Sequence, residues 1–310
     1  MKVMTTLFPV FFMIALGIVS RLRGWITAEQ KDGARSLVFG VLFPILIFNA
    51  IFTSSLSAST AWIILYVTIA FIAVYLLGTL LCRKGNGRYD HLIPYLLTTC
   101  EGGNVALPLY TTIVGAGYAI NTVTFDMAGT IIAFILIPIL VSAKTSENMD
   151  AKALFRKTMT NSLVLAALSG IILNLCGVYH LLEQSVFLPL YTDAVSMALA
   201  PIGGVILFTI GYDLKVDTAM ISSILKAFLM RAAGGLLIIG GFRILFPSLM
   251  ADAIFRTAVF LYFMSPTGFA LPTQLSPLCK DESDSAFMSS FISIYILLTL
   301  AVYIAIVITY

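Results

Sequence analysis

The chain has 310 residues, of which 60% are apolar and only 11% are charged, and its formal net charge is +3. A mean hydropathy of +1.02 lies far above that of a soluble domain, so the composition excludes a soluble enzyme or a nucleic-acid-binding module. The four cysteines have unrelated spacings, which indicate neither a metal site nor a disulfide framework. The sequence therefore predicts an all-α integral membrane protein.

Apolar stretches long enough to span a bilayer follow one another along the whole chain, at about 20 residues per crossing. We predict ten of them, near 4–22, 36–54, 61–81, 92–114, 119–142, 160–178, 188–211, 223–246, 253–276 and 286–309. The first is read as a spanning helix rather than a signal peptide, because Arg21 and Arg23 follow it directly without a cleavage site of small residues.

Basic residues fall mostly in alternate loops, which sets the orientation of the predicted helices. With the N terminus outside, most lysines and arginines lie in inward-facing connections, as expected for cytoplasmic loops. Arg243 and Arg256 are the exceptions in outward connections. This asymmetry predicts a multi-pass protein of the cell membrane with both ends outside.

The longest polar connection divides the ten stretches into two groups of five. We assign 1–142 to a first repeat, 143–160 to a cytoplasmic connecting loop and 161–310 to a second repeat. Because five is odd, two homologous halves joined in this way must be inverted relative to each other across the membrane.

Prolines occur at matching places in these two halves. Pro108 and Pro272 each end an Ala-Leu-Pro tripeptide in the fourth and ninth stretches, while Pro44 and Pro201 lie in the second and seventh. Proline removes a backbone donor, so we expect each helix to break or kink there. Paired interruptions in two halves are typical of a transporter's substrate site. Chance placement of common membrane prolines is the alternative.

The residues of several stretches resemble a known family. The opening run at 8–52 is FPVFFMIALGIVSRLRGWITAEQKDGARSLVFGVLFPILIFNAIF, and it is similar to the first two helices of the auxin efflux carrier family. The run from Asn104 to Pro108 resembles that family's asparagine and proline crossover motif. The runs Pro201-Ile202-Gly203-Gly204 and Ile210-Gly211-Tyr212-Asp213-Leu214 resemble its seventh helix.

The resemblance covers nearly the whole chain and implies ten helices in two inverted repeats. It further implies that helices four and nine are unwound and cross at mid-membrane, and that a scaffold and a crossover assembly move against each other. Bacterial members of the family transport small organic acids, so malate, malonate or auxin-like carboxylates are the implied substrates. Glu101 departs from the crossover motif and argues against simple anion transfer.

Two carboxylates are candidates for ion coupling. If the fourth helix starts near Leu92, Glu101 lies roughly 14 Å along it, close to mid-membrane. An ionised group at that depth is costly, so Glu101 is expected to be protonated, paired or cation-bound, and the alternative is a packed, permanently protonated acid. Asp126 and the hydroxyl of Thr130 are interpreted as a second oxygen-rich site, or as an interfacial cap.

A substrate site is predicted where the two interruptions meet. Asn104 can donate to a carboxylate without a buried charge, and its alternative role is to bond carbonyls freed by the broken helix. The candidates for this site are Gly103, Asn104, Pro108, Ser265, Pro272, Thr273 and Gln274. Arg231, about five residues into the eighth helix, is expected to snorkel to the cytoplasmic surface, with an anion clamp as the less favoured role.

These observations favour a secondary transporter of small organic anions that works by alternating access. A proton- or sodium-coupled carrier of another solute and a membrane sensor that does not transport are the alternatives. We expect no enzyme, because the sequence contains no HExxH motif and no serine–histidine pairing. No cofactor is expected beyond a coupling H⁺ or Na⁺, the partners are an organic acid and the bilayer rather than nucleic acid, and a homodimer stays open.

Overall fold

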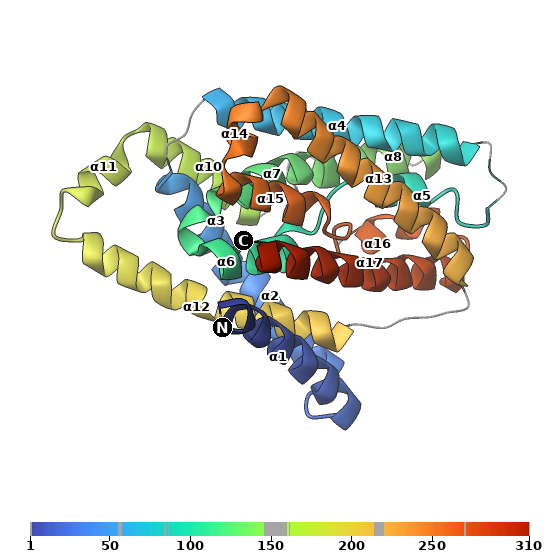
Figure 1. Cartoon of the computed structure of the whole chain (residues 1–310), viewed down its shortest axis with the longest axis horizontal. Helices are drawn as coiled ribbons and strands as arrows, with labels where there is room; N and C mark the ends of the chain where they lie inside the picture. Colours follow the sequence, from blue (N-terminus) through green and yellow to red (C-terminus); the bar gives the residue numbers. More distant parts are fainter. Residues whose placement is uncertain are drawn as a thin grey trace.

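The computed structural model describes residues 2–54, 58–83, 85, 87–145, 160, 162–213, 220–269 and 271–309. All regular structure in these ranges is helical, and they contain no strand (Figure 1). Five of the helices described are long and apolar enough to cross a membrane: Ala28–Phe52, Ser59–Arg83, Leu188–Asp213, Ile221–Leu245 and Glu282–Thr309. The prediction of an all-α, membrane-embedded chain is confirmed at this level.

The first half of the chain forms helices that are interrupted by short π-helical turns. They are α1 (Lys2–Arg23), α2 (Ala28–Leu37), η1 (Val38–Leu42), α3 (Phe43–Phe52), α4 (Ala58–Arg83), α5 (Ile93–Leu96), η2 (Gly102–Ala106), α6 (Leu107–Val114), η3 (Ala116–Tyr118), α7 (Ile120–Ile131), η4 (Ile132–Leu136) and α8 (Ile137–Thr145). The predicted connecting loop at 143–160 lies almost wholly outside the described residues.

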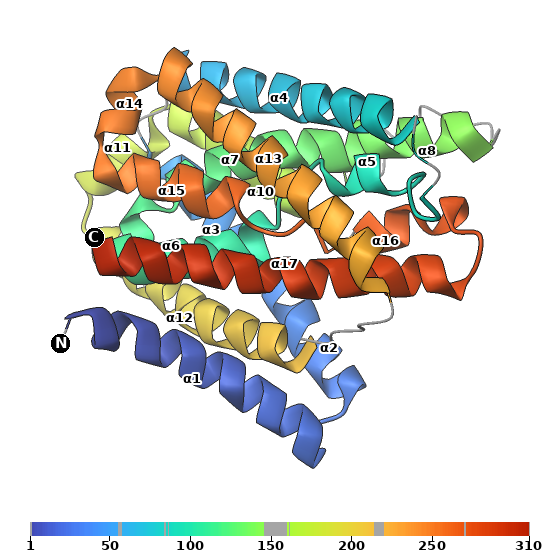
Figure 2. The same ribbon diagram turned by 45° about the vertical axis from the view of Figure 1, so that its right-hand side comes forward.

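The second half contains three long helices, α12, α13 and α17, together with shorter ones. They are α10 (Ser162–Leu175), α11 (Val178–Glu183), α12 (Leu188–Asp213), α13 (Ile221–Leu245), α14 (Pro247–Ala251), α15 (Ala253–Phe263), α16 (Leu271–Gln274), η6 (Ser276–Leu278) and α17 (Glu282–Thr309). The start of α1 and the end of α17 lie at the same end of the molecule (Figure 2).

The helices pack into two groups, and each group contains helices from both halves of the chain. In the first group α1 packs along α12, α10 packs along α3, and α12 also contacts α3 (Figure 2). In the second group α4 contacts α5, α7 and α13, and α15 contacts α6, α7, α13 and α17. Each half therefore contributes helices to both groups.

Glycines allow the helix pairs of the first group to approach closely. A Cβ atom placed on Gly17 would lie 2.0 Å from the carbonyl oxygen of Phe208, and one placed on Gly211 would lie 1.9 Å from that of Ile14. Between α10 and α3, a Cβ on Gly170 would lie 3.1 Å from the carbonyl oxygen of Phe48. Close backbone approach through small residues is a main source of helix association in lipid, where burial of apolar surface contributes little.

The breaks expected at Pro44 and Pro201 do not match: the π turn η1 interrupts regular α-helix directly before Pro44, whereas no break occurs at Pro201. Pro44 occupies the first turn of α3 directly after the π turn η1, which widens the helix and leaves the missing N–H without a required partner. Pro201 lies inside α12, which continues as a helix from Leu188 to Asp213. The matched prolines of these two helices therefore mark no matched break.

Two asparagines bond across helices, as expected for polar residues inside a bundle. The side-chain amide of Asn174 on α10 donates to the carbonyl oxygens at the end of α3, at 3.1 Å to Ile51 and 2.9 Å to Phe52. The Tyr191 hydroxyl of α12 donates to Asn49 Oδ1 on α3 at 2.8 Å. These bonds join α3 to both α10 and α12.

The close contact between α1 and α12 predicts a strong response to added volume. Gly17→Ala should lower the free energy of unfolding by about 1–3 kcal/mol, because the new methyl group collides with backbone that cannot rotate away. Gly240→Ala is the matched control, since a Cβ there meets no atom within 4 Å. Equal thermal stability of the two purified variants in detergent would contradict this account of the packing.

Candidate functional site

The chain leaves the helical path between α5 and η2, directly before the Gly-Gly-Asn run. Regular α-helix ends at Leu96 and π-helix begins at Gly102. Within the gap Thr99 has φ +49°, the only positive φ among the non-glycine residues described, and such a conformation is costly for a β-branched side chain. The surrounding contacts must hold this segment in place.

A second gap separates α15 from α16 in the other half of the chain. It begins after Phe263 and ends at Leu271, and Ala270 within it lies outside the described residues. Pro108 and Pro272 each lie in the first turn of the α-helix that follows a gap, where proline is tolerated. The breaks therefore precede the two prolines instead of occurring at them, which corrects the sequence interpretation.

The two irregular segments lie against each other and exchange hydrogen bonds. The backbone N–H of Glu101 donates to the carbonyl oxygen of Pro266 at 2.7 Å. The Thr267 hydroxyl donates to the carbonyl oxygen of Thr98 at 3.1 Å, and its oxygen lies 3.3 Å from the Thr99 hydroxyl. Each gap thus satisfies part of the backbone that the other leaves free.

A buried arginine from α13 supplies donors to both gaps. Arg231 is only 3% exposed, and its guanidinium donates to the carbonyl oxygens of Leu96, Thr98, Thr99 and Ser265 over 2.8–3.3 Å. These carbonyls follow the C-terminal ends of α5 and α15, where a positive charge is favourable. The guanidinium also lies 5.3 Å from the ring centroid of Tyr295.

The expectation that Arg231 snorkels to the surface is wrong. The five N–H donors of a guanidinium point in fixed directions and can reach carbonyls of both gaps at once. The ammonium group of a lysine cannot make the same set of bonds. The available signal was that Arg231 is a basic residue within an otherwise apolar stretch. Sequence alone did not show that the freed carbonyls would surround it.

Glu101 links the two crossing segments through both of its carboxylate oxygens. Oε1 accepts from the backbone N–H of Asn104 at 3.2 Å and from the Asn104 side-chain amide, while Oε2 accepts from the backbone N–H of Phe269 in the other gap. Glu101 therefore caps η2, and it is not a residue within a regular helix as the depth calculation assumed. The carboxylate occupies the N-terminal end of η2.

Asp126 on α7 brings a second carboxylate to the same region. The Tyr262 hydroxyl of α15 donates to Asp126 Oδ1 at 3.2 Å. A Cβ on Gly102 would lie 2.2 Å from that oxygen, so only glycine allows Asp126 to approach the residue after Glu101. The Thr130 hydroxyl donates to the Asp126 backbone carbonyl at 2.8 Å instead of to its carboxylate. Tyr262 was not predicted, and no sequence signal distinguished it from other aromatic residues.

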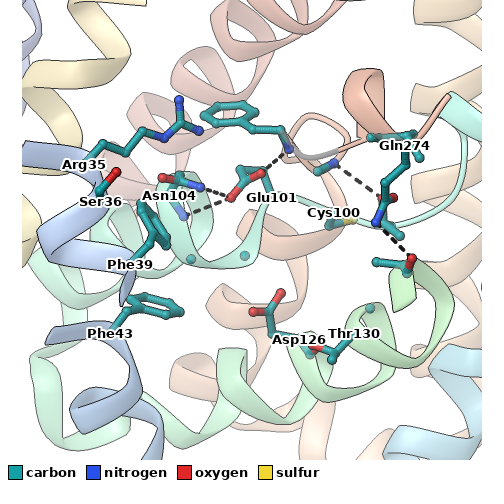
Figure 3. Close-up of a pocket in the computed structure, with 18 residues that line it drawn as sticks. Arg35, Ser36, Phe39, Phe43, Cys100, Glu101, Asn104, Asp126, Thr130 and Gln274 are labelled. Carbon is teal, nitrogen blue, oxygen red and sulfur yellow. Dashed lines mark hydrogen bonds between the residues drawn. The ribbon is translucent and has the colours of Figure 1, made fainter. Parts of the chain in front are cut away.

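A cavity of about 460 Å³ brings most of the predicted site residues together (Figure 3). Its wall includes Glu101, Gly103, Asn104, Asp126, Thr130 and Gln274. Three predicted residues whose side chains are described are absent from this wall: Pro108, Ser265 and Pro272. Ser265 donates to the Tyr262 carbonyl at 2.7 Å, as hydroxyls beside helices commonly do, and the Thr273 side chain lies outside the described part of the structure.

Gln274 and the glycine beside Asn104 have local roles at this cavity. The Gln274 side-chain amide donates to the Ala133 carbonyl oxygen at 3.0 Å, within the π turn η4. A Cβ on Gly103 would lie 2.5 Å from the Phe43 ring, so this glycine permits the crossing segment to pack against α3. Both contacts shape the cavity and leave its carboxylates accessible from within.

The cavity wall also contains a cation that sequence reasoning had assigned to a loop. The Arg35 side chain is 27% exposed, its Nη1 lies 3.4 Å from Asp213 Oδ2, and its guanidinium lies 5.1 Å from the Phe269 ring centroid. Glu101, by contrast, is only 7% exposed. The cavity therefore runs from a partly exposed guanidinium to a buried carboxylate (Figure 3).

A second, apolar cavity of about 210 Å³ adjoins the first at Asp126 and Thr130. Side chains from α3, α4, α7 and α10 form its wall, among them Ile47, Ile64, Val123 and Leu168. Neither cavity contains a metal-binding cluster: within the described ranges no three His, Cys, Asp or Glu side chains gather closely enough.

No protein-family model and no curated protein matches the chain. The site is accordingly interpreted from its own geometry.

The hydrogen bonds of the Arg231 guanidinium predict a large loss of folding stability when this group is replaced. Arg231→Lys keeps the charge but leaves buried carbonyls unpaired, so the free energy of unfolding should fall by about 1–3 kcal/mol for each orphaned carbonyl. Thermal unfolding of the purified protein measures this, with Arg243→Lys at the exposed end of α13 as control. If the two variants unfolded at the same temperature, Arg231 would not hold the crossing segments.

Proposed function

We propose that the chain is a secondary transporter of small organic anions and a bacterial-type member of the auxin efflux carrier family. The observation that carries this proposal is the pair of broken segments that cross and line one polar cavity from both halves of the chain. Irregular backbone at membrane depth is tolerated only where it lines a cavity or is buried in protein, and paired breaks of this kind form transporter sites.

Packing of helices from one half against helices from the other half supports two inverted repeats of five spans. Packing of α1 on α12 pairs the first span with the seventh, and packing of α10 on α3 pairs the sixth with the second. The gaps between α5 and η2 and between α15 and α16 interrupt the fourth and ninth spans. Corresponding spans of the two halves thus make corresponding contacts, as a pseudo-two-fold axis in the membrane plane requires.

The two helix groups correspond to a scaffold and a moving crossover assembly. We assign α1, α2–α3, α10 and α12 to the scaffold, and the remaining spans to the crossover assembly. The cavity lies between them, with Arg35 and Phe43 from the scaffold facing Glu101 and Asn104 from the other group. Displacement of one group against the other would close this side of the cavity and open the opposite side.

Orientation from the basic loops makes the exposed side of the cavity cytoplasmic. Arg35 lies near the start of the second span, which is inside when both chain ends are outside. The cell membrane is the expected location. An organic anion entering from the cytoplasm would first meet a guanidinium, which suits a carboxylate in charge and geometry.

A coupling ion is favoured by a second observation. Glu101 and Asp126 place two carboxylates near each other at the crossing. Uncompensated charge is expensive in a membrane interior, so the site is expected to carry H⁺ or Na⁺ during part of the cycle. A coupled carrier of another solute is the alternative function that this observation supports.

Uptake by proteoliposomes tests the transport proposal directly. We expect the purified chain to accumulate labelled malate or malonate under an imposed proton or sodium gradient, whereas protein-free liposomes should not. Absence of substrate-dependent flux under every gradient would contradict transport and favour a membrane sensor.

Arg35 should determine the apparent affinity for the anion. Removing its charge by Arg35→Gln is expected to raise the KM for malate uptake about tenfold, the effect of losing roughly 1.4 kcal/mol of charge-assisted binding. Arg243→Gln, an exposed arginine outside the cavity wall, is the matched control. An unchanged KM in Arg35→Gln would exclude this residue from anion binding.

A further inference from the structure

One polar atom of the cavity wall lacks a partner. Asn104 is 6% exposed, and its Oδ1 is buried without a hydrogen bond from any described residue. The other side of the same amide donates from Nδ2 to Glu101 Oε1 (Figure 3). A buried acceptor without a donor is unfavourable, so this oxygen marks a place for a ligand or for a different amide orientation.

The protonation state of the Glu101 carboxyl decides which orientation of the Asn104 side-chain amide is favoured. An ionised carboxylate only accepts hydrogen bonds, so it requires the Nδ2 donor and leaves Oδ1 without a donor. A protonated Glu101 must donate, and Phe269, whose N–H donates to Oε2, offers it no acceptor. The adjacent acceptor is Asn104 Oδ1, which reaches the new O–H when the amide turns through half a rotation.

We propose that Glu101 and Asn104 form a proton-operated selector, in which protonation of Glu101 inverts the Asn104 amide and turns its Nδ2 hydrogens toward a carboxylate anion in the cavity. This inference rests on the proposed transport of organic anions and specifies what the site binds: one carboxylate together with one proton. When Glu101 is ionised, Asn104 Oδ1 occupies the position that Nδ2 takes in the protonated state, and this oxygen disfavours binding of an anion.

Protonation with a bound anion gives every polar group of the Glu101–Asn104 pair a partner, whereas the ionised state leaves Asn104 Oδ1 unpaired. The proton enters from water in the cavity and resides on Glu101 Oε1, which then donates to Asn104 Oδ1 and still accepts from the Asn104 backbone N–H. Oε2 keeps its bond from Phe269, so the crossing segments stay joined. The Nδ2 group loses the carboxylate as its acceptor and gains the substrate, and no buried donor is left unpaired.

Other ionisable groups around Glu101 come from four elements. They are Arg35 on α2, Asp126 on α7, Arg231 on α13 and Tyr262 on α15. Arg231 is committed to the backbone carbonyls of both gaps, and Tyr262 donates to Asp126. Arg35 can contact the same anion. Asp126 is the competing site for the proton, so the experiment must separate it from Glu101.

Anion binding to the purified full-length chain tests the stoichiometry. With malate as the probe, over a pH range in which malate stays ionised, the Kd should rise tenfold per pH unit above the titration of Glu101. Glu101→Gln should abolish this slope, whereas Asp126→Asn should retain it. A slope that persists in Glu101→Gln would overturn the proposal.

The amide of Asn104 is tested by an isosteric replacement. Asn104→Asp has no Nδ2 hydrogens in either orientation, so malate binding should be lost at every pH at which its carboxyl is ionised. Gln184→Glu places an added charge at an exposed site outside the cavity wall and should bind like the unchanged chain. Wild-type affinity in Asn104→Asp would contradict the role of Nδ2.

Infrared difference spectroscopy can follow Glu101 and Asn104 in the unaltered protein without any substrate. The result then depends neither on the folding of a variant nor on the transport function. On lowering the pH of the unaltered protein carrying isotope-labelled asparagine, a carboxylic acid band should appear together with a shifted asparagine amide band. Glu101→Gln should lose both. An acid band of Glu101 without an amide shift would overturn the selector. Both bands without malate binding at any pH would support the selector and contradict transport of organic anions.

Discussion

The Arg231 guanidinium holds together the part of the structure on which the site depends. Two segments leave the helical path inside an apolar bundle, and each exposes carbonyl oxygens that water cannot reach. Arg231 satisfies carbonyls of both segments at once. Because its planar donors point in fixed directions, the guanidinium also fixes how the segments cross.

The position of the carboxylates follows from that crossing. Once the gaps are joined, the Glu101 N–H bonds to Pro266 and the Glu101 carboxylate reaches the Phe269 N–H. The same residue therefore contributes to the structural contact with its backbone and to the cavity with its side chain. Any movement of one half-helix relative to the other changes the surroundings of Glu101, which is what coupling between an ion and a conformational change requires.

Much of the fold was predictable because it depends on composition and local pattern. Hydropathy identified a helical membrane chain, and the break expected at Pro108 lies a few residues before that proline. The prolines were a weaker guide. Pro201 is accommodated within a continuous helix, and Pro108 and Pro272 lie after the breaks, because proline is compatible with the first turn of a helix.

Several polar residues in the wall of the site were also predictable, since polar residues in apolar stretches are few. Glu101, Asn104, Asp126 and Gln274 all line one cavity. Arg231, Arg35 and Tyr262 were missed or misplaced for one reason, which is that their roles depend on residues more than 30 positions away in the sequence. A single sequence shows that a charge is buried but not which carbonyls or carboxylates surround it.

Charge balance gives a reason for the pairing of proton and anion that does not depend on hydrogen-bond geometry. Two carboxylates, Glu101 and Asp126, lie beside one deeply buried cation, Arg231, while the charge of the partly exposed Arg35 is shared with Asp213, 3.4 Å away. A substrate carboxylate would add a third negative charge where each uncompensated charge costs several kcal/mol. Protonation of one carboxyl offsets the negative charge that the substrate carboxylate adds. Glu101 is the carboxyl whose neutral form also supplies the anion with a donor, through Asn104, so both requirements are met by the same proton.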